Sequence, residues 1–148
     1  MLLIYNNSMK KKILSYVLVC LVSIPCVASA DTFLLTVNGV KAGQGNLRIA
    51  VFDEAHREDF PDGEYLLGVV VAATEEGMTV EISNLESGEY AIAVIQDLNE
   101  NGKLDKNFLG IPKEPYGFSG QWKSGSSSFD KALFNTGELG FATTITLK

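Results

Sequence analysis

Short apolar runs with a period of two recur along residues 32–148, and glycine-rich turns separate them. Alternation of this kind places every second side chain on one face of a strand, so each run predicts a β-strand with one buried face. We expect strands over residues 32–37, 46–52, 65–73, 78–82, 90–94 and 141–147. Helical periodicity over three turns is missing, so the pattern favours an all-β, antiparallel sandwich of about seven strands.

The first 30 residues have the three parts of a secretion signal in the expected order. Lys10–Lys12 are basic, residues 13–27 are apolar, and small residues at Ala28 and Ala30 form a signal-peptidase motif. The apolar run is shorter than the roughly 20 residues of a spanning helix. We therefore expect cleavage after Ala30, a single domain over 31–148 without a membrane span, and a periplasmic or secreted location. The true start of the chain is expected at Met1 or at Met9.

Removal of this leader changes the chemistry of the chain. Both cysteines, Cys20 and Cys26, lie inside it, so the exported part has no thiol for a disulfide or a metal. Loss of Lys10–Lys12 also lowers the formal net charge from −6 to −9. This acidity disfavours nucleic acid and anionic membranes as partners. The expected partner is a small ligand or another component of the cell envelope.

Residues 97–105 form the most specific chemical motif of the sequence. The spacing D-x-N-x-N-G-x-x-D places oxygen-bearing side chains at positions one, three, five and nine. Loops that wrap a hard cation such as calcium use this arrangement, with a backbone carbonyl at position seven. The predicted metal ligands are Asp97, Asn99, Asn101, Asp105 and the carbonyl of Lys103.

The same loop also permits a structure without an ion. Position twelve is Phe108 instead of a bidentate glutamate, and two asparagines lower the ligand charge, so a calcium site here would be weak. In the alternative, the Asn and Asp side chains accept local backbone hydrogen bonds, and Gly102 takes a positive φ to make a rigid turn. The sequence leaves both alternatives open, and calcium is the only cofactor it indicates.

Residues 107–134 form a long, aromatic segment that is predicted to be one irregular loop. In a functional interpretation, Tyr116, Phe118 and Trp122 provide a ligand-binding surface, because such side chains join a large apolar area to polar groups. In a structural interpretation, the same rings close one open end of the sandwich, since a small domain needs its aromatic residues inside.

Catalytic residues are not indicated. His56 is the single histidine and lies among charged neighbours, and Ser119 sits in G-F-S-G, which does not match the nucleophile elbow G-x-S-x-G. We therefore predict an exported, non-enzymatic protein that is a binding or a structural module of the cell envelope. The alternative is an enzyme that acts on carbohydrate or peptidoglycan with a pair of carboxylates near residues 97–118.

Four blocks, residues 88–94, 97–105, 107–119 and 128–132, resemble a bacterial family, Domain of Unknown Function 2141. The strings N-G-K-L-D and G-I-P-K-E-P-Y-G-F-S carry most of the resemblance, which implies an envelope location and no particular activity. The family pattern has a histidine directly before the first aspartate of the loop. Gln96 stands there in this chain, so no role of that histidine is carried over.

A more distant likeness concerns the glycine turn that leads into a strand at Gly88–Tyr90. It is similar to β-sandwiches of the transthyretin and carboxypeptidase-regulatory type, which are mostly binding or structural modules. This likeness implies an immunoglobulin-like (transthyretin-like) β-sandwich and carries no function by itself.

Overall fold

The computed structural model describes residues 32–123, 125, 127–139 and 142–148, so the predicted leader at 1–30 lies outside the described residues. The strands are β1 (Phe33–Asn38), β2 (Asn46–Phe52), β3 (Leu67–Ala72), β4 (Gly77–Ile82), β5 (Glu89–Asp97), β6 (Tyr116–Phe118), β7 (Phe134–Asn135) and β8 (Ala142–Thr146). The helices are the 3-10 helix η1 (Glu54–Asp59) and the one-turn helices α1 (Phe129–Ala132) and α2 (Thr136–Leu139).

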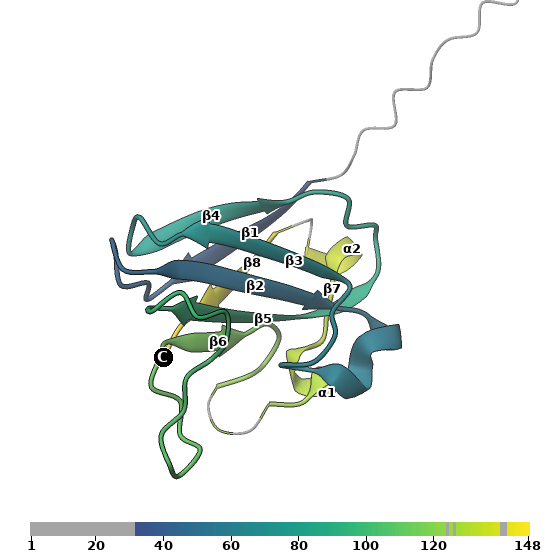
Figure 1. Cartoon of the computed structure of the whole chain (residues 1–148). Coiled ribbons are helices and arrows are strands. Elements are labelled where there is room, and N and C mark those ends of the chain that lie inside the picture. Colours follow the sequence, from purple (N-terminus) through teal and green to yellow (C-terminus); the bar gives the residue numbers. More distant parts are fainter. Residues whose placement is uncertain (1–31, 124, 126, 140–141) are drawn as a thin grey trace, which may run out of the picture.

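The strands form two facing sheets (Figure 1). The smaller sheet has the order β4-β1-β8, and the larger one has the order β3-β2-β5-β6, with β7 paired to β5. This arrangement confirms the predicted all-β sandwich. One pair departs from the expected antiparallel pattern, because β8 runs parallel to β1. Ala142 lies opposite Leu34, so β8 enters the small sheet at the end where β1 begins.

The inner faces predicted from the alternation form the main core. The buried side chains of this core include Phe33, Leu35 and Val37 from β1, Leu47, Ile49 and Val51 from β2, Ile92 and Val94 from β5, and Ile145 from β8. Each such side chain contributes about 1.5–3 kcal/mol when it leaves water. The regular alternation therefore accounts for both the strands and their pairing into two layers.

The central strand β5 is buried on its outer face as well. Ala91 and Ala93 point away from the main core and pack in a second cluster with Phe52 and Phe129. Because alanine is small, η1 and α1 can lie close to this face, where the Arg57 guanidinium donates two hydrogen bonds to Asp130, at 2.9 and 2.6 Å. Figure 1 shows η1 and α1 side by side next to the larger sheet.

The segment 107–134 is more ordered than the predicted irregular loop, since it contains β6 and α1 and ends at β7. Phe134, the last aromatic residue of the segment, packs against Phe33 in the main core, with ring centroids 5.4 Å apart. Phe118 and Phe129 instead join the cluster on the outer face of the larger sheet. The reason is that β6 pairs with β5 and so places this segment along the sheet edge.

Candidate functional site

The predicted cation loop is a turn that its own side chains hold closed. Asp97 accepts hydrogen bonds from the backbone N–H groups of Asn101, at 3.0 Å, and Gly102, at 2.7 Å. The Asn99 side chain accepts a further bond from the N–H of Asn101, and the Asn101 side chain accepts one from the N–H of Lys103. Gly102 has the predicted positive φ of 88°. The first three predicted ligand side chains therefore wind around one short segment of backbone.

Asp105 closes this ring from the other side. Its carboxylate accepts hydrogen bonds from the amide nitrogens of Asn99, at 2.7 Å, and Asn101, at 3.1 Å. The bond from Asn101, followed by that from Asn99, lowers the pKa of the Asp105 carboxyl below its usual value. All four predicted ligand side chains thus come together, and Asp105 is held in its charged form. These side-chain hydrogen bonds close the loop on themselves.

The oxygen atoms of this loop are of the type that binds calcium, but their negative charge is low even for a weak calcium site. The loop offers two carboxylates, Asp97 and Asp105, and otherwise amide and carbonyl oxygens, which are suitable but weaker calcium ligands. The Arg48 guanidinium lies 4.0 Å from Asp97 Oδ2 and competes electrostatically with a cation. Among the described residues, no three His, Cys, Asp or Glu side chains are grouped to hold a metal.

Glu114 is a part of this loop that sequence reasoning missed. It is 6% exposed, and its two carboxylate oxygens accept the backbone N–H groups of Leu98, at 2.8 Å, and Asp105, at 2.9 Å. One buried carboxylate therefore ties the two ends of the loop together. No local signal could have found it, because Glu114 follows Leu98 by 16 residues and stands in no ligand pattern.

The same contacts bear on the predicted carboxylate pair of a carbohydrate-acting enzyme. Asp97 and Glu114 are the two buried acids within residues 97–118, and each of their four oxygens accepts a backbone N–H. A general acid or a nucleophile needs a carboxylate oxygen that faces the substrate. These two side chains hold the chain in place instead, and the enzyme alternative gains no catalytic pair from them.

Gln96 anchors the loop to the turn before β2. Its side chain is fully buried, accepts the N–H of Lys41, and donates to the carbonyls of Lys41, at 2.8 Å, and Gln44, at 2.7 Å. The contact between the two segments is close, since a Cβ on Gly45 would lie 2.0 Å from the carbonyl oxygen of Asp97. Gln96 thus has a structural role in this chain.

The predicted aromatic residues lie together but differ in their surroundings. The ring centroids of Tyr116, Phe118 and Trp122 are 5.0–5.7 Å apart. Phe118 also contacts Phe60, at 5.4 Å, and belongs to the cluster on the outer face of the larger sheet. Tyr116 and Trp122 instead border a groove of about 440 Å³ next to Glu114. The structure therefore gives Phe118 a packing role and leaves two rings at an open surface.

The groove is lined by basic side chains, Lys41, Lys113 and Lys148, beside the two rings. The Lys148 ammonium lies 5.4 Å from the centre of the Trp122 ring, which is the distance of a cation–π contact. In the described part of the chain, none of these three ammonium groups pairs with a carboxylate within 4.0 Å. Three of the basic residues of an acidic protein thus meet in one groove.

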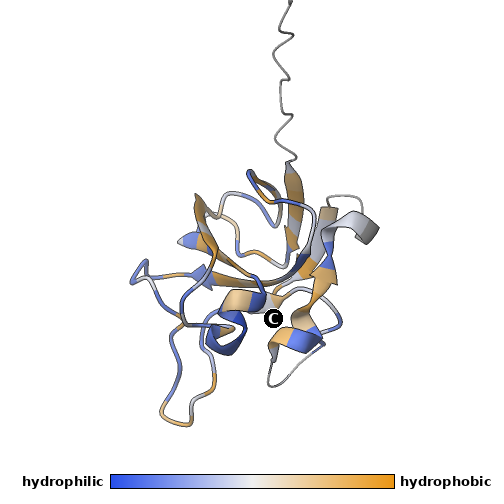
Figure 2. Ribbon diagram, turned by 90° about the vertical axis from the view of Figure 1, so that its right-hand side faces the viewer, coloured by the Kyte–Doolittle hydropathy of each residue, from blue (hydrophilic) through white to orange (hydrophobic). Residues whose placement is uncertain are grey.

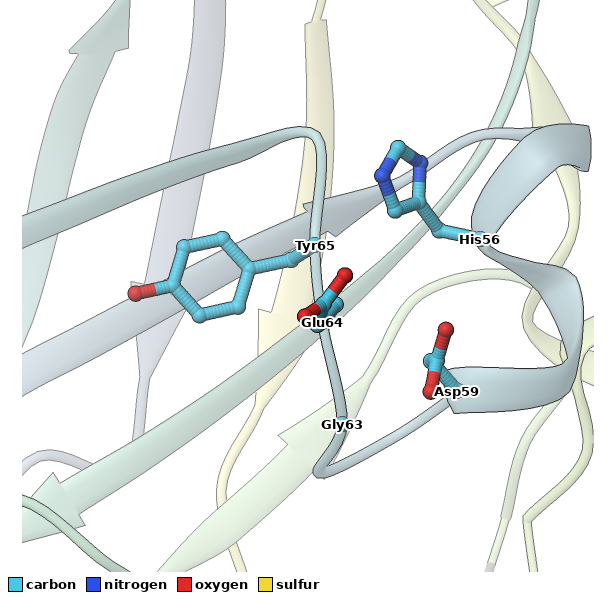
Figure 3. Close-up of a pocket in the computed structure, with 5 residues that line it drawn as sticks. All are labelled: His56, Asp59, Gly63, Glu64 and Tyr65. Atoms are coloured by element: carbon cyan, nitrogen blue, oxygen red, sulfur yellow. The ribbon is translucent and has the colours of Figure 1, made fainter.

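A second hollow of about 590 Å³ lies on another side of the molecule, between η1 and β3. Its lining includes His56, Asp59, Glu64 and Tyr65, whose side chains do not converge on one point in Figure 3. The His56 ring nitrogen lies 2.5 Å from Asp53, and this hydrogen bond lowers the pKa of Asp53. Because Asp53 also accepts the N–H of His56 at the start of η1, this pair caps the helix. We therefore place the candidate site at the groove.

Comparison with known protein families identifies a match. A family model described as "Uncharacterized protein conserved in bacteria (DUF2141)" matches residues 35–142, a range that contains the 97–105 loop and both rings of the groove. No curated protein and no solved structure matches the chain. Within the described residues, the helices are too short or too polar to cross a membrane.

Proposed function

The chain belongs to the DUF2141 family of bacterial proteins, and we propose that it is a non-enzymatic binding module of the cell envelope. Its ligand site is the groove beside Tyr116 and Trp122. The observation that carries the proposal is the meeting of these two rings with three lysines that have no acidic partner within 4.0 Å among the described residues. The leader-like residues 1–30 support a location outside the cytoplasm.

The chemistry of the groove favours a small anionic ligand with a ring. An aromatic face can stack against the apolar C–H face of a sugar ring, while ammonium groups attract a carboxylate or a phosphate. Glu114 lines the same groove, but both of its carboxylate oxygens are taken up by backbone N–H groups. A carboxylated sugar such as glucuronate combines the two features that the lining selects for.

Titration with glucuronate, followed by tryptophan fluorescence, tests this proposal. Trp122 is the single tryptophan of the chain, so its emission reports on the groove alone. We expect a saturable change with glucuronate and a much weaker one with neutral glucose. The variant Lys113→Gln should weaken the apparent affinity by about 2–5-fold, which is the usual size of one exposed charge interaction.

The matched control is Lys131→Gln, which removes the same charge from α1, outside the groove. It should bind glucuronate as the parent protein does. A fluorescence change that does not saturate, or an equal loss of affinity in both lysine variants, would show that the groove is not the ligand site.

Weak calcium binding in the 97–105 loop is a second candidate function. The observation that favours it is the convergence of the Asp97, Asn99, Asn101 and Asp105 side chains within hydrogen-bonding distance of one short turn. Calcium modules outside the cell work at affinities of about 10⁻⁴–10⁻³ M, so a loop with only two carboxylates can still fill in that compartment. The bound ion would replace the hydrogen bonds that now link the amides to Asp105.

Thermal melting in calcium and in chelator tests the second candidate. An ion that binds only the folded state stabilises it by about 1.4 kcal/mol at ten times its dissociation constant, so we expect Tm to rise by roughly 5 °C. Asp105→Asn should abolish the rise, and Asp62→Asn, an exposed acid outside the loop, should keep it. Equal melting temperatures of the parent protein in calcium and chelator would establish the ion-free turn.

A further inference from the structure

The tip of the segment 106–113 exposes three apolar side chains to solvent. Phe108 is 95% exposed, Leu109 is 67% exposed and Ile111 is 56% exposed. In Figure 1 this segment, in green, extends away from both sheets, and in Figure 2 the far end of the extended loop is orange, which marks hydrophobic residues. An exposed apolar group of this kind marks a contact with a partner or a membrane more often than it supports the fold.

The backbone of the tip is paired within the tip itself. The N–H of Asn107 donates to the carbonyl of Ile111, and the N–H of Gly110 donates to the carbonyl of Asn107. The Asn107 side chain accepts two further bonds, from the N–H groups of Leu109, at 2.9 Å, and Ile111, at 3.0 Å. Four backbone N–H groups of the tip therefore have hydrogen-bond acceptors within the tip. Such pairing removes much of the penalty for moving backbone from water into an apolar medium.

Charge is arranged around the apolar tip in a way that suits a lipid headgroup region. Lys106 and Lys113 flank it on both sides, and no Asp or Glu lies between them. Lysine can keep its ammonium group near phosphates while its methylene groups lie along an apolar surface. Lys106 also lies 3.7 Å from Asp62 Oδ2, and the acids Asp105 and Glu114 stand next to the two lysines in the sequence, so the basic frame consists of these two ammonium groups alone.

The small size of the tip favours a bilayer over a protein partner. A stable protein–protein interface covers about 800 Å² on each partner, whereas one aromatic side chain covers about 150–250 Å². Phe108, Leu109 and Ile111 at the end of a projecting loop are too few for such an interface. Because a single myristoyl chain already binds a bilayer only marginally, the contact that these three side chains make with lipid is weak and reversible.

We propose that the tip inserts Phe108, Leu109 and Ile111 into the headgroup boundary of a lipid bilayer, with Lys106 and Lys113 at the phosphates. The formal charge of the chain, −6 with the leader included, opposes a strongly anionic surface. The occupant is therefore a mainly zwitterionic bilayer. This contact holds the protein at a membrane surface. Ile111 and Lys113 also line the groove, so the lipid contact and the ligand site share these two residues.

Flotation with phosphatidylethanolamine–phosphatidylcholine vesicles tests the proposal, using the protein purified without detergent. The parent protein should float with the vesicles, and Phe108→Ser combined with Leu109→Ser should reduce the bound fraction by about tenfold or more. The Tm of this variant should match that of the parent protein, because the two side chains are largely exposed. Leu66→Ser is the matched control, since Leu66 is 46% exposed and lies outside the tip.

A positive readout comes from Phe108→Trp, because tryptophan is favoured at membrane interfaces. Its emission should shift to the blue when vesicles are added, while the parent protein, with Trp122 alone, should show no such shift. The proposal is overturned if the parent protein stays in the bottom fraction, or if the serine variant floats as well as the parent. Capture of the tip by a soluble protein, with no flotation, would also overturn it.

Discussion

Replacing Gln96 by glutamate is expected to lower the free energy of unfolding by about 3–5 kcal/mol at pH 7. The amide nitrogen of Gln96 donates to the carbonyls of Lys41 and Gln44, and the residue is fully buried. A carboxylate oxygen in that place would face two carbonyl oxygens, so two hydrogen bonds would be lost and a buried charge would have no partner. Urea denaturation followed by circular dichroism measures the loss.

The loss should depend on pH in a defined direction. Burial among carbonyls raises the pKa of the new carboxyl in the folded state above its unfolded value of about 4.3. The folded variant therefore binds its proton more tightly than the unfolded chain, and its stability is greatest below about pH 4.3. As the pH rises towards the folded pKa, stability should fall by about 1.4 kcal/mol per pH unit relative to the parent protein.

Gln121→Glu is the control for this variant, because Gln121 is exposed and the change in charge is the same. It should stay within about 0.5 kcal/mol of the parent protein at every pH. If Gln96→Glu behaves in the same way as Gln121→Glu, the hydrogen bonds of Gln96 do not hold the turn to the loop.

The strands could be predicted from the sequence because their signal is local. In β2, which was predicted with its observed bounds, Leu47, Ile49 and Val51 alternate with less buried neighbours, and burial of one face follows directly. The direction of β8 could not be predicted in this way. It depends on where the chain re-enters the small sheet after α2, and alternation along β8 is the same for a parallel and an antiparallel partner.

The long aromatic segment was predicted to be irregular because its strand signal is too short. β6 has only three residues. It forms because it pairs with the free edge of β5, where Gly117 lies opposite Val94. A Cβ on Gly117 would lie 2.8 Å from Ile145, so the close approach of β8 requires glycine there. Tertiary contacts of this kind leave no periodic pattern in the sequence.

Only a part of the candidate site could be predicted, because tertiary contacts bring the other part together. The 97–105 loop could be identified, since its predicted ligands follow one another within nine residues. The groove could not, because Lys41, Lys113 and Lys148 are far apart in sequence and meet only when β6 and the end of the chain pair. Tyr116 and Trp122 were selected as aromatic residues in a long loop, without any indication of the lysines beside them.

Replacing Glu114 by glutamine is expected to lower the free energy of unfolding by about 2–3 kcal/mol. One of the two carboxylate oxygens becomes an amide NH₂ group, which cannot accept a hydrogen bond. Either the N–H of Leu98 or the N–H of Asp105 therefore loses its acceptor. The side chain is 6% exposed, so water replaces the lost bond poorly. Urea denaturation gives the stability, and hydrogen exchange of the Asp105 amide shows whether the loop end has opened.

Glu100→Gln is the matched control, because it removes the same charge from an exposed position of the same loop. It should change stability by less than about 0.5 kcal/mol and leave exchange at Asp105 slow.

The same two variants also distinguish the calcium-bound loop from the ion-free turn. If calcium binds there, Glu114→Gln should reduce the calcium-dependent rise in Tm, because Asp105 is then no longer held beside Asn99 and Asn101. An unchanged rise would mean that the ion-binding geometry does not depend on Glu114.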